Sequence, residues 1–327
     1  MGTENVVLKL ANKYAIFVIL IVMVVALSFL SPFFLTGQNL INVLITESGR
    51  GILALGVAFT IMSKGIDLSV GSVVSLVSVI VASMVQDPTY TARIFPNMPY
   101  VAPLVAIVVG LFVGTLVGVI NGSLIAYTGI PPFIATLGTQ IIARGIALII
   151  TNAYPVPMLR QDFKDIGQGS VGVIPNVVIV FAVIAIIAYL LLNHTKFGKS
   201  VYAIGGNVNA ARTSGIKVEK NLVEIYAFSA FCASLAGVLI TSRAASGIAT
   251  LGTGYETDAI AAATIGGTSH AGGIGTVPGI LAGILILGVL NNGLLLLGIS
   301  PYLQQVIKGA IIIGAVVFDM RKNARKH

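Results

Sequence analysis

Charged side chains are rare in this sequence, and four of them stand inside long apolar stretches. Ionisable groups in such segments are costly to bury and are functional candidates by default. Glu47 and Arg50 are three residues apart, so they can pair on one helix face, which would make them structural. Arg144 and Lys308 have no charged partner nearby in the sequence. We expect each of them to bond a helix carbonyl, snorkel to the membrane surface or face a wet cavity.

Uncharged polar residues supply a second group of candidates. Asn121, Asn291 and Asn292 carry donors and acceptors of the kind that bind sugar hydroxyls, although asparagine also holds helices together. Asp67 and Ser69 stand where a helix is expected to begin, and capping of the first free backbone amides would account for both. With Glu47 and two acids from the segment 255–258, they form the candidate set for a translocation pathway: Glu47, Asp67, Ser69, Asn121, Glu256, Asp258, Asn291 and Asn292.

Motifs for catalysis are absent from the sequence. The segment 197–200 (FGKS) imitates the end of a phosphate-binding loop, but Asn193 occupies the position of the earlier glycine. The segment 273–278 likewise fails the dinucleotide fingerprint. Cys232 is interpreted as a small buried hydrophobe, and the histidines are too scattered for a metal site: His194, His270 and His327. We therefore expect that this chain is not an enzyme, does not itself bind ATP, and holds no cofactor or metal.

The composition indicates the elements that must position these residues. Of 327 residues, 56% are hydrophobic and 9% are charged, and the mean hydropathy is +1.00. Soluble globular chains carry about 25% charged residues. We therefore predict an all-α membrane protein in which residues 1–327 form one transmembrane domain. The net charge of +8 does not indicate a nucleic-acid partner, because the basic residues flank apolar spans and act as topology signals.

Apolar stretches of about 20 residues, the length that a membrane crossing needs, recur along the chain. We predict about ten spans, of which the eighth is short and broken: 14–30, 40–62, 68–85, 101–127, 133–151, 174–192, 222–240, 258–267, 272–297 and 302–318. The first has the charged start of a signal peptide but lacks a small-residue cleavage site, so we keep it as a span. The longest segment without membrane character is 194–221.

The basic residues predict the orientation, because cytoplasmic loops are enriched in lysine and arginine. With both termini in the cytoplasm, twelve basic residues are inside: Lys9, Lys13, Lys64, five in the segment 194–221 and four in the tail after residue 320. Four are outside: Arg93, Arg160, Lys164 and Arg243. Eight or nine spans would break this asymmetry, unless a segment re-enters from the side it left.

Glycines at four-residue spacing predict close helix packing, since small residues let helix backbones approach each other in a bilayer. Two faces of this kind are present: Gly110, Gly114 and Gly118, and Gly275, Gly279 and Gly283. We expect both to be helix contacts, and the alternative is that they line the solute path. Pro278 within the second run predicts a kink or a helix start.

Two segments, 118–131 and 288–301, resemble each other without gaps. They share glycine, asparagine, leucine and proline at the same spacing: Gly118, Asn121, Leu124 and Pro131, and Gly288, Asn291, Leu294 and Pro301. If spans one to five and six to ten are repeats, the odd number of spans inverts one half relative to the other. Inverted five-helix repeats are common among transporters, whose solute sites lie near the repeat interface. Chance similarity between two glycine-rich helices is the alternative.

Five further motifs follow one another along the chain. They are the segments 63–72 (SKGIDLSVGS), 203–216 (AIGGNVNAARTSGI), 254–262 (GYETDAIAA), 266–273 (GGTSHAGG) and 291–293 (NNG). Together they resemble the permease subunit of bacterial ABC importers for ribose, galactose and xylose, over nearly the whole chain. The glycine-rich C-terminal third resembles ribose permeases, whereas the segment 308–313 and the basic tail resemble galactoside permeases.

The resemblance implies an assembly in the bacterial inner membrane. A second copy of the permease would complete a homodimer, with ABC ATPase domains that bind ATP and Mg²⁺ on the cytoplasmic face. A periplasmic or lipid-anchored sugar-binding protein would lie outside. The segment 194–221 would carry the short helix that docks into the ATPase, and by motif this falls on Gly205, Gly206, Asn207, Ala210, Ala211, Arg212, Ser214 and Gly215. A solvated linker is the alternative interpretation of that segment.

The predicted function is import of a monosaccharide by alternating access, driven by a separate ATPase. A neutral sugar needs no counter-charge, so a pathway of small residues, serine, threonine and asparagine would suffice. One alternative is an ion-coupled secondary transporter with Glu47 or Asp67 as its coupling site. Others are an ABC permease for nucleosides or branched-chain amino acids, and a structural scaffold. We expect selectivity to reside mainly in the binding protein, so the sequence does not name the sugar.

Overall fold

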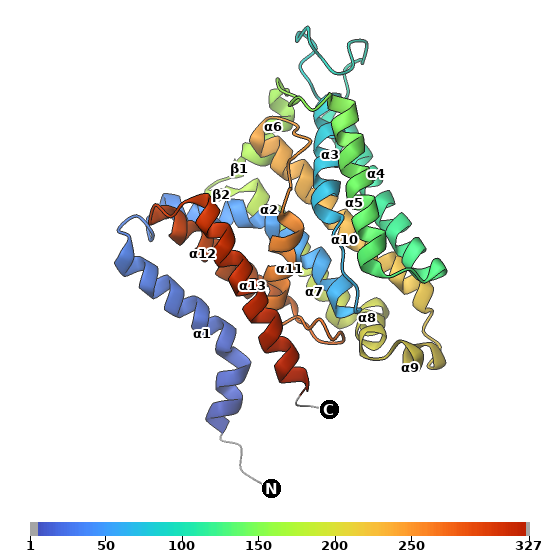
Figure 1. Ribbon diagram of the computed structural model, residues 1–327. Helices are drawn as coiled ribbons and strands as arrows, with labels where there is room; N and C mark the ends of the chain where they lie inside the picture. The colour runs from blue at the N-terminus through green and yellow to red at the C-terminus, as the bar shows by residue number, and fades with distance from the viewer. Residues whose placement is uncertain (1–5, 325–327) are drawn as a thin grey trace.

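The computed structural model describes residues 6–324 of the chain, with side chains described for residues 16–317. These residues fold mainly into helices joined by loops (Figure 1). The helices are α1 (Val6–Leu30), α2 (Gly37–Met62), α3 (Val70–Met84), α4 (Pro103–Ser123), α5 (Pro132–Thr151), α6 (Gln161–Gln168), α7 (Asn176–His194), α8 (Lys196–Gly206), α9 (Val208–Thr213), α10 (Val218–Ala244), α11 (Tyr255–Ile265), α12 (Val277–Leu296) and α13 (Pro301–Ala324). A π turn, η1 (Leu124–Thr128), extends α4.

A small hairpin departs from the all-α prediction. Strands β1 (Ser170–Val171) and β2 (Ile174–Pro175) pair antiparallel across a turn in which Gly172 has a φ of 62°, a conformation that favours glycine. Pro175 keeps an extended backbone, with φ −63° and ψ 140°, so α7 begins at Asn176 and not at residue 174 as predicted.

All ten predicted spans overlap helices, and the multi-span helical class is confirmed. Among the described residues, six helices are long and apolar enough to cross a membrane: α2, α4 with η1, α5, α7, α10 and α12. The apolar parts of α1, α3 and α13 are shorter. α11 has 11 residues and is the short helix predicted at 258–267, although it begins earlier, at Tyr255. The count of ten spans stays a prediction.

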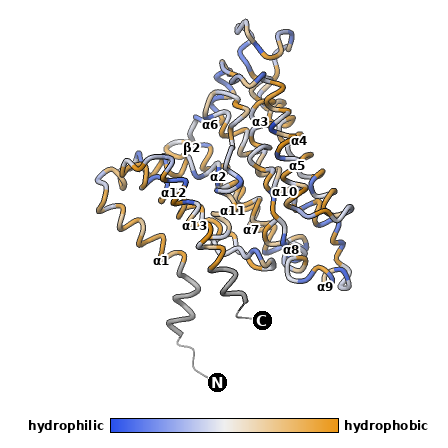
Figure 2. Tube along the Cα trace, in the orientation of Figure 1, coloured by the Kyte–Doolittle hydropathy of each residue, from blue (hydrophilic) through white to orange (hydrophobic). Residues whose placement is uncertain are grey.

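The two ends of the molecule carry different elements. The start of α1, the end of α13, and α8 and α9 lie at the lower end of Figure 1, whereas the loop 85–102 and α6 lie at the upper end. Hydrophilic residues gather at both ends, with apolar helices between them (Figure 2). This agrees with the prediction that the segment 194–221 shares a side with both termini. The side chains of Lys9, Lys13 and the basic tail lie outside the described residues.

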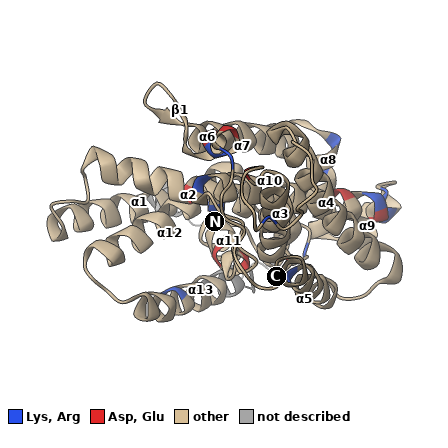
Figure 3. Ribbon diagram, turned by 90° about the horizontal axis from the view of Figure 1, so that it is seen from above, with Lys and Arg blue, Asp and Glu red and all other residues tan. Residues whose placement is uncertain are grey.

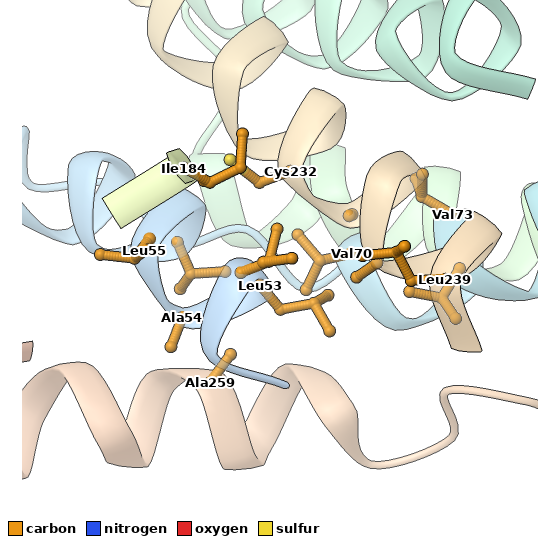
Figure 4. Packing of buried hydrophobic residues seen from close by; sticks show 14 of the residues in the cluster. Leu53, Ala54, Leu55, Val70, Val73, Ile184, Cys232, Leu239 and Ala259 are labelled. Carbon is orange, nitrogen blue, oxygen red and sulfur yellow. The ribbon is translucent and has the colours of Figure 1, made fainter. Parts of the chain in front are cut away.

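The core is formed where α2, α3 and α10 cross. α2 is buried on all sides from Gly51 to Met62, and 13 of the 15 residues of α3 are buried. Apolar side chains from five helices meet at this crossing, including Leu53 and Leu55 of α2, Val70 and Val73 of α3, Ile184 of α7, Cys232 and Leu239 of α10, and Ala259 of α11 (Figure 4). Large apolar side chains on α1, α4, α5, α7 and α13 face outward, as lipid contacts require.

The predicted glycine face of α4 is a helix contact, and so are two of the three glycines of the second face, whereas Gly275 lies in the loop before α12. On α4, a Cβ at Gly114 would meet Ser234 Oγ of α10, and one at Gly118 would meet the carbonyl oxygen of Tyr226 at 2.3 Å. On α12, Gly279 and Gly283 lie against the end of α11 in the same way. Pro278 occupies the first turn of α12, so it marks a helix start and not a kink.

The segments that resemble each other stand at equivalent places in two helix pairs. Asn121 lies near the end of α4 and Pro131 precedes α5, while Asn291 lies near the end of α12 and Pro301 begins α13. In Figure 1, α5 runs upward and α13 runs downward. Inverted repeats require this opposition of direction, and the repeat itself stays a prediction.

Candidate functional site

A polar cavity lies between α2, α12 and α13. Its volume is about 360 Å³, within the range of small-ligand sites. Apolar surface from Val43, Gly288, Leu295 and Leu296 forms part of its lining. The other lining residues have amide, hydroxyl or charged side chains: Asn39, Asn42, Thr46, Glu47, Arg50, Asn291, Asn292, Gln304 and Lys308. We call it the α2–α12–α13 cavity. Three of the predicted pathway residues, Glu47, Asn291 and Asn292, therefore meet here although they come from opposite ends of the sequence.

Four charges in and beside the cavity compensate one another. Arg50 Nη1 lies 3.2 Å from Glu47 Oε1, and its Nε lies 3.9 Å from Asp258 Oδ2. Lys308 Nζ donates to both carboxylate oxygens of Asp258, at 3.2 and 3.3 Å. Charged residues gather around α2, α11 and α13 in the view from above (Figure 3). The pairing of Glu47 with Arg50 is confirmed, and Lys308 has a partner that its sequence neighbourhood did not reveal.

The amides of the cavity are not equally satisfied. Asn39 and Asn292 form a reciprocal pair, with Nδ2 to Oδ1 distances of 2.9 and 2.8 Å. Asn291 Oδ1 is buried and accepts no hydrogen bond from the described residues. Buried polar atoms in native proteins nearly always have a partner, so this oxygen is a candidate to accept a hydrogen bond from a group beyond the described residues.

A second polar group is closed and lies between α3, α4, α5 and α10. Asp67 accepts hydrogen bonds from the Ser69 amide (3.0 Å), the Ser69 hydroxyl (2.6 Å) and the Ser229 hydroxyl (2.8 Å). Asn121 donates to Ser69 Oγ at 3.0 Å and accepts from Thr139 Oγ1 at 2.7 Å. Asp67, Ser69, Asn121 and Ser229 are fully buried. We call the five residues Asp67, Ser69, Asn121, Thr139 and Ser229 the Asp67 cluster.

The Asp67 cluster corrects the capping interpretation. Ser69 is the N-cap of α3, but no side-chain cap bond from it is present, and its hydroxyl donates to Asp67 instead. Asp67 does accept the Ser69 amide, so it closes the turn before the helix. The hydrogen bonds of the cluster join the start of α3 to α4, α5 and α10.

Glu256 belongs to neither group. It stands two residues before Asp258 on α11, and because a helix turns about 100° per residue, the two carboxylates face different neighbours. Glu256 Oε1 accepts from Gln140 of α5 at 3.4 Å, and its Oε2 lies against Gly71, where an added Cβ would collide with it. Arg144 of α5 donates to Ser72 Oγ (3.2 Å) and Thr253 Oγ1 (2.5 Å). Arg144 therefore bonds side chains and not a helix carbonyl.

The segment 194–221 forms two short helices, α8 and α9, at the lower end of the molecule (Figure 1). Six predicted docking residues are exposed: Gly206, Asn207, Ala210, Arg212, Ser214 and Gly215. The other two are buried beneath them. Ala211 packs with Ile204 and Val218, and a Cβ at Gly205 would lie 1.8 Å from the carbonyl oxygen of Met62. Asn207 Oδ1 accepts the amides of Asn209 and Ala210 and so caps α9.

Hydrogen bonds attach α8 to the lower end of α2 and to the loop before α12. Lys64 Nζ donates to the Gly206 carbonyl at 3.2 Å, and the Gly273 amide donates to the Met62 carbonyl at 2.8 Å. The Tyr202 hydroxyl donates to the Gly275 carbonyl at 2.7 Å. Burial raises the pKa of Tyr202, which keeps this hydroxyl protonated as a donor. α2 therefore connects α8 at one end with the α2–α12–α13 cavity at the other.

The upper surface is held together around Arg160. Its guanidinium lies 4.1 Å from the ring centre of Tyr100 and donates to the Val101 carbonyl at 2.6 Å. Partial burial would raise the pKa of Asp162, but hydrogen bonds from Arg160 and Tyr100 outweigh it and hold that pKa below its usual value. The loop 85–102 is thus fixed to the start of α6.

Several residues of these sites were missed from the sequence. Thr139 and Ser229 complete the Asp67 cluster, and Asn39, Asn42 and Gln304 line the cavity. Each of these residues is polar and lies in or beside an apolar stretch, and that position is the sequence feature that could have identified it as a site residue. Among the described residues, no group of three or more His, Cys, Asp and Glu side chains could hold a metal ion.

Comparisons with known proteins agree with one another over nearly the full chain. Residues 39–316 match the family described as branched-chain amino acid transport system / permease component. The chain is 41% identical to the galactose/methyl galactoside import permease protein MglC of Escherichia coli (strain K12), covering 95% of each chain. It is 42% identical to the ribose import permease protein RbsC of Bacillus subtilis (strain 168), covering 96% of this chain and 94% of that protein. No solved structure matches.

Proposed function

The chain belongs to this permease family, and from that premise we propose that it is the membrane subunit of an ABC importer that carries a monosaccharide into the cell. The observation that carries the proposal is the identity of about 40%, over nearly the full length, with import permeases for galactose and for ribose. Ribose, galactose or methyl galactoside, and xylose are the proposed cargo. The chain itself is not an enzyme, because its relatives are permease subunits.

The rival functions have less support. An amino-acid cargo rests on the family description alone, whereas both relatives named above are sugar permeases. An ion-coupled transporter would need a carboxylate free to exchange an ion. Glu47 pairs with Arg50, and Asp67 is enclosed by three donors. Neither acid has the solvent-accessible, unpaired environment of a coupling site.

We propose that the importer contains two copies of this chain, ATPase domains on the cytoplasmic face and a sugar-binding protein outside, in the bacterial inner membrane. The ATPase domains would bind ATP and Mg²⁺, and the chain would need no cofactor of its own. The exposed residues of α8 and α9 are the proposed docking surface for the ATPase. Their position at the same end of the molecule as the start of α1 and the end of α13 supports cytoplasmic termini.

The proposed mechanism is alternating access. ATP binding closes the ATPase domains and moves α8 and α9, and hydrolysis reverses the movement. Because Lys64 and Met62 at the end of α2 are bonded to Gly206 and Gly273, α2 is the element that would pass this movement toward the cavity. The Asp67 cluster would move as a rigid unit, since its hydrogen bonds join four helices.

Reconstitution tests the proposed function. The chain would be placed in proteoliposomes with its ATPase and its binding protein, and uptake of ribose, galactose, xylose and isoleucine would be measured with and without ATP. We expect ATP-dependent uptake of one of the sugars. Uptake of isoleucine alone, or sugar uptake that survives ATP depletion and collapses with the ion gradient, would contradict the proposal.

Substitutions at two adjacent glycines test the docking surface. Nothing lies within 4 Å of a Cβ built at Gly206, so Gly206→Trp should leave the fold intact and abolish sugar-stimulated ATP hydrolysis. Gly206→Ala is the matched control and should hydrolyse ATP normally. Gly205→Ala should instead disturb the fold, because its methyl group would collide with the Met62 carbonyl. Normal stimulation in Gly206→Trp, or labelling of residues 194–221 from outside intact cells, would contradict the docking assignment.

A further inference from the structure

We propose that the α2–α12–α13 cavity binds one monosaccharide molecule within a single copy of the chain. This inference rests on the proposed function and names where in the chain the sugar binds. The cavity volume of about 360 Å³ lies near the lower end of the roughly 300–1,000 Å³ typical of small-ligand sites. A single sugar with a few waters fits that space.

The lining matches the chemistry of a sugar. Asn39, Asn42, Asn291, Asn292 and Gln304 surround the cavity, and each amide carries both a donor and an acceptor. Sugar hydroxyls also donate and accept, so they can bond either end of an amide. Asn291 lines the cavity, and its Oδ1 has no donor among the described residues. That oxygen is itself enclosed, so the Asn291 side chain would have to turn toward the cavity for a sugar hydroxyl to supply the donor.

The charges of the cavity favour a neutral ligand. Arg50 is paired with Glu47, and Lys308 is paired with Asp258, so two positive and two negative charges cancel. A zwitterionic amino acid would need a cation for its carboxylate and an anion for its ammonium group. Binding it here would break one of the existing pairs, which leaves a partly buried charge without a partner. An uncharged polyol makes no such demand.

Cysteine labelling tests the site directly. The chain contains one cysteine, Cys232, which is fully buried, so a cysteine introduced at Asn42 should be the position of this chain that reacts with a maleimide. The complete importer carrying Asn42→Cys would be labelled in lipid nanodiscs, where both faces are accessible. At a concentration about four times its dissociation constant, the transported sugar should slow labelling about fivefold, because only empty sites react. Asn97→Cys, in the exposed loop 85–102, is the control and should label at the same rate with and without sugar.

A second substitution links this protection to the amides. Asn291→Leu keeps the approximate side-chain shape but removes the amide atoms that could bond a sugar. In the Asn42→Cys background it should raise the sugar concentration needed for half-protection about three- to tenfold, the equivalent of one hydrogen bond. Thr46→Cys, which also lines the cavity, is the second reporter if Asn42→Cys does not assemble with the ATPase.

The outcomes separate this inference from the proposed function. If the unsubstituted importer transports a sugar but that sugar protects neither reporter, the cavity is not its binding site and the proposed function stands. Protection by isoleucine in place of sugar would also overturn the inference. If the unsubstituted importer transports no sugar, the proposed function itself is wrong.

Discussion

The Asp67 cluster and the α2–α12–α13 cavity are built from the same kinds of residue, yet one is closed and the other is open. Asn121 and Asn291 occupy matching places in two similar segments, each near the end of a helix. Asn121 is fully buried, donates to Ser69 and accepts from Thr139. Asn291 lines a cavity, and its side-chain oxygen has no donor among the described residues.

This difference shows that the type of a polar residue does not by itself determine whether it holds helices together or binds a solute. In the Asp67 cluster, every hydrogen bond is made inside the chain, so the polar residues stabilise the packing. In the cavity, the charges are paired and most amides bond protein groups, but their side chains line open space and Asn291 Oδ1 has no donor among the described residues. We therefore expect substitutions in the cluster to act on stability, and substitutions in the cavity to act on transport.

The largest expected effect is that of Asp67→Leu. The substitution leaves three buried donors, from Ser69 and Ser229, without an acceptor, and each unpaired group costs about 1–3 kcal/mol. We expect a loss of about 3 kcal/mol or more, seen as a lower unfolding temperature or poor recovery of folded protein. Asp165→Leu, at an exposed acid of α6, is the control and should change little. An Asp67→Leu protein as stable as the parent would mean that the cluster does not hold the helices together.

Asn121→Leu is expected to destabilise by a smaller amount. Two hydrogen bonds are lost, and Ser69 and Thr139 each keep another partner, so the expected cost is about 2 kcal/mol. The measurement is thermal unfolding in detergent. Asn121→Ser, which keeps one polar contact, should lie between the parent and Asn121→Leu, and the reverse order would argue against the hydrogen bonds as the cause.

Lys308→Met tests the charged part of the cavity. It leaves Asp258 with Arg50 at 3.9 Å as its nearest cation, and we expect a loss of about 1–2 kcal/mol because both side chains are partly exposed. Adding Asp258→Asn should recover most of that loss. A double-mutant cycle with no coupling between the two positions would show that the pair contributes nothing to stability.

Asn291→Leu should have the smallest effect on stability, within about 0.5 kcal/mol of the parent, because it removes a buried oxygen that has no partner. Sugar transport should nevertheless fall in the reconstituted importer. Measuring stability and transport in both Asn121→Leu and Asn291→Leu therefore compares the closed cluster with the open cavity at matching positions of the two segments. Equal losses of stability in the two variants would remove the distinction between a closed and an open site.

The sequence predicted the helices better than the contacts between them. Apolar runs show where helices lie because bilayer thickness sets their length, and the short α11 was visible as an interrupted run. Glycine spacing correctly marked the contacts of α4 and α12, since backbone approach depends on a local pattern. The pairing of Lys308 with Asp258, 50 residues apart, and the bonds of Asp67 to Ser229 depend on how helices cross. No local pattern encodes such crossings, so the cavity could not be assembled from the sequence.

The position of α3 has a consequence for the surrounding lipid. Its 15 residues span about 22 Å, less than the roughly 30 Å of a hydrocarbon layer, and it is enclosed by other helices. Ser72, Ser75 and Ser78 form hydrogen bonds with other protein groups. The surroundings of α3 are therefore other helices and not lipid acyl chains. A change in acyl-chain length would therefore reach α3 only through the tilt of the longer helices that meet the bilayer, such as α4. If transport depends on membrane thickness, we therefore expect the cause to be a change in the tilt of these longer helices.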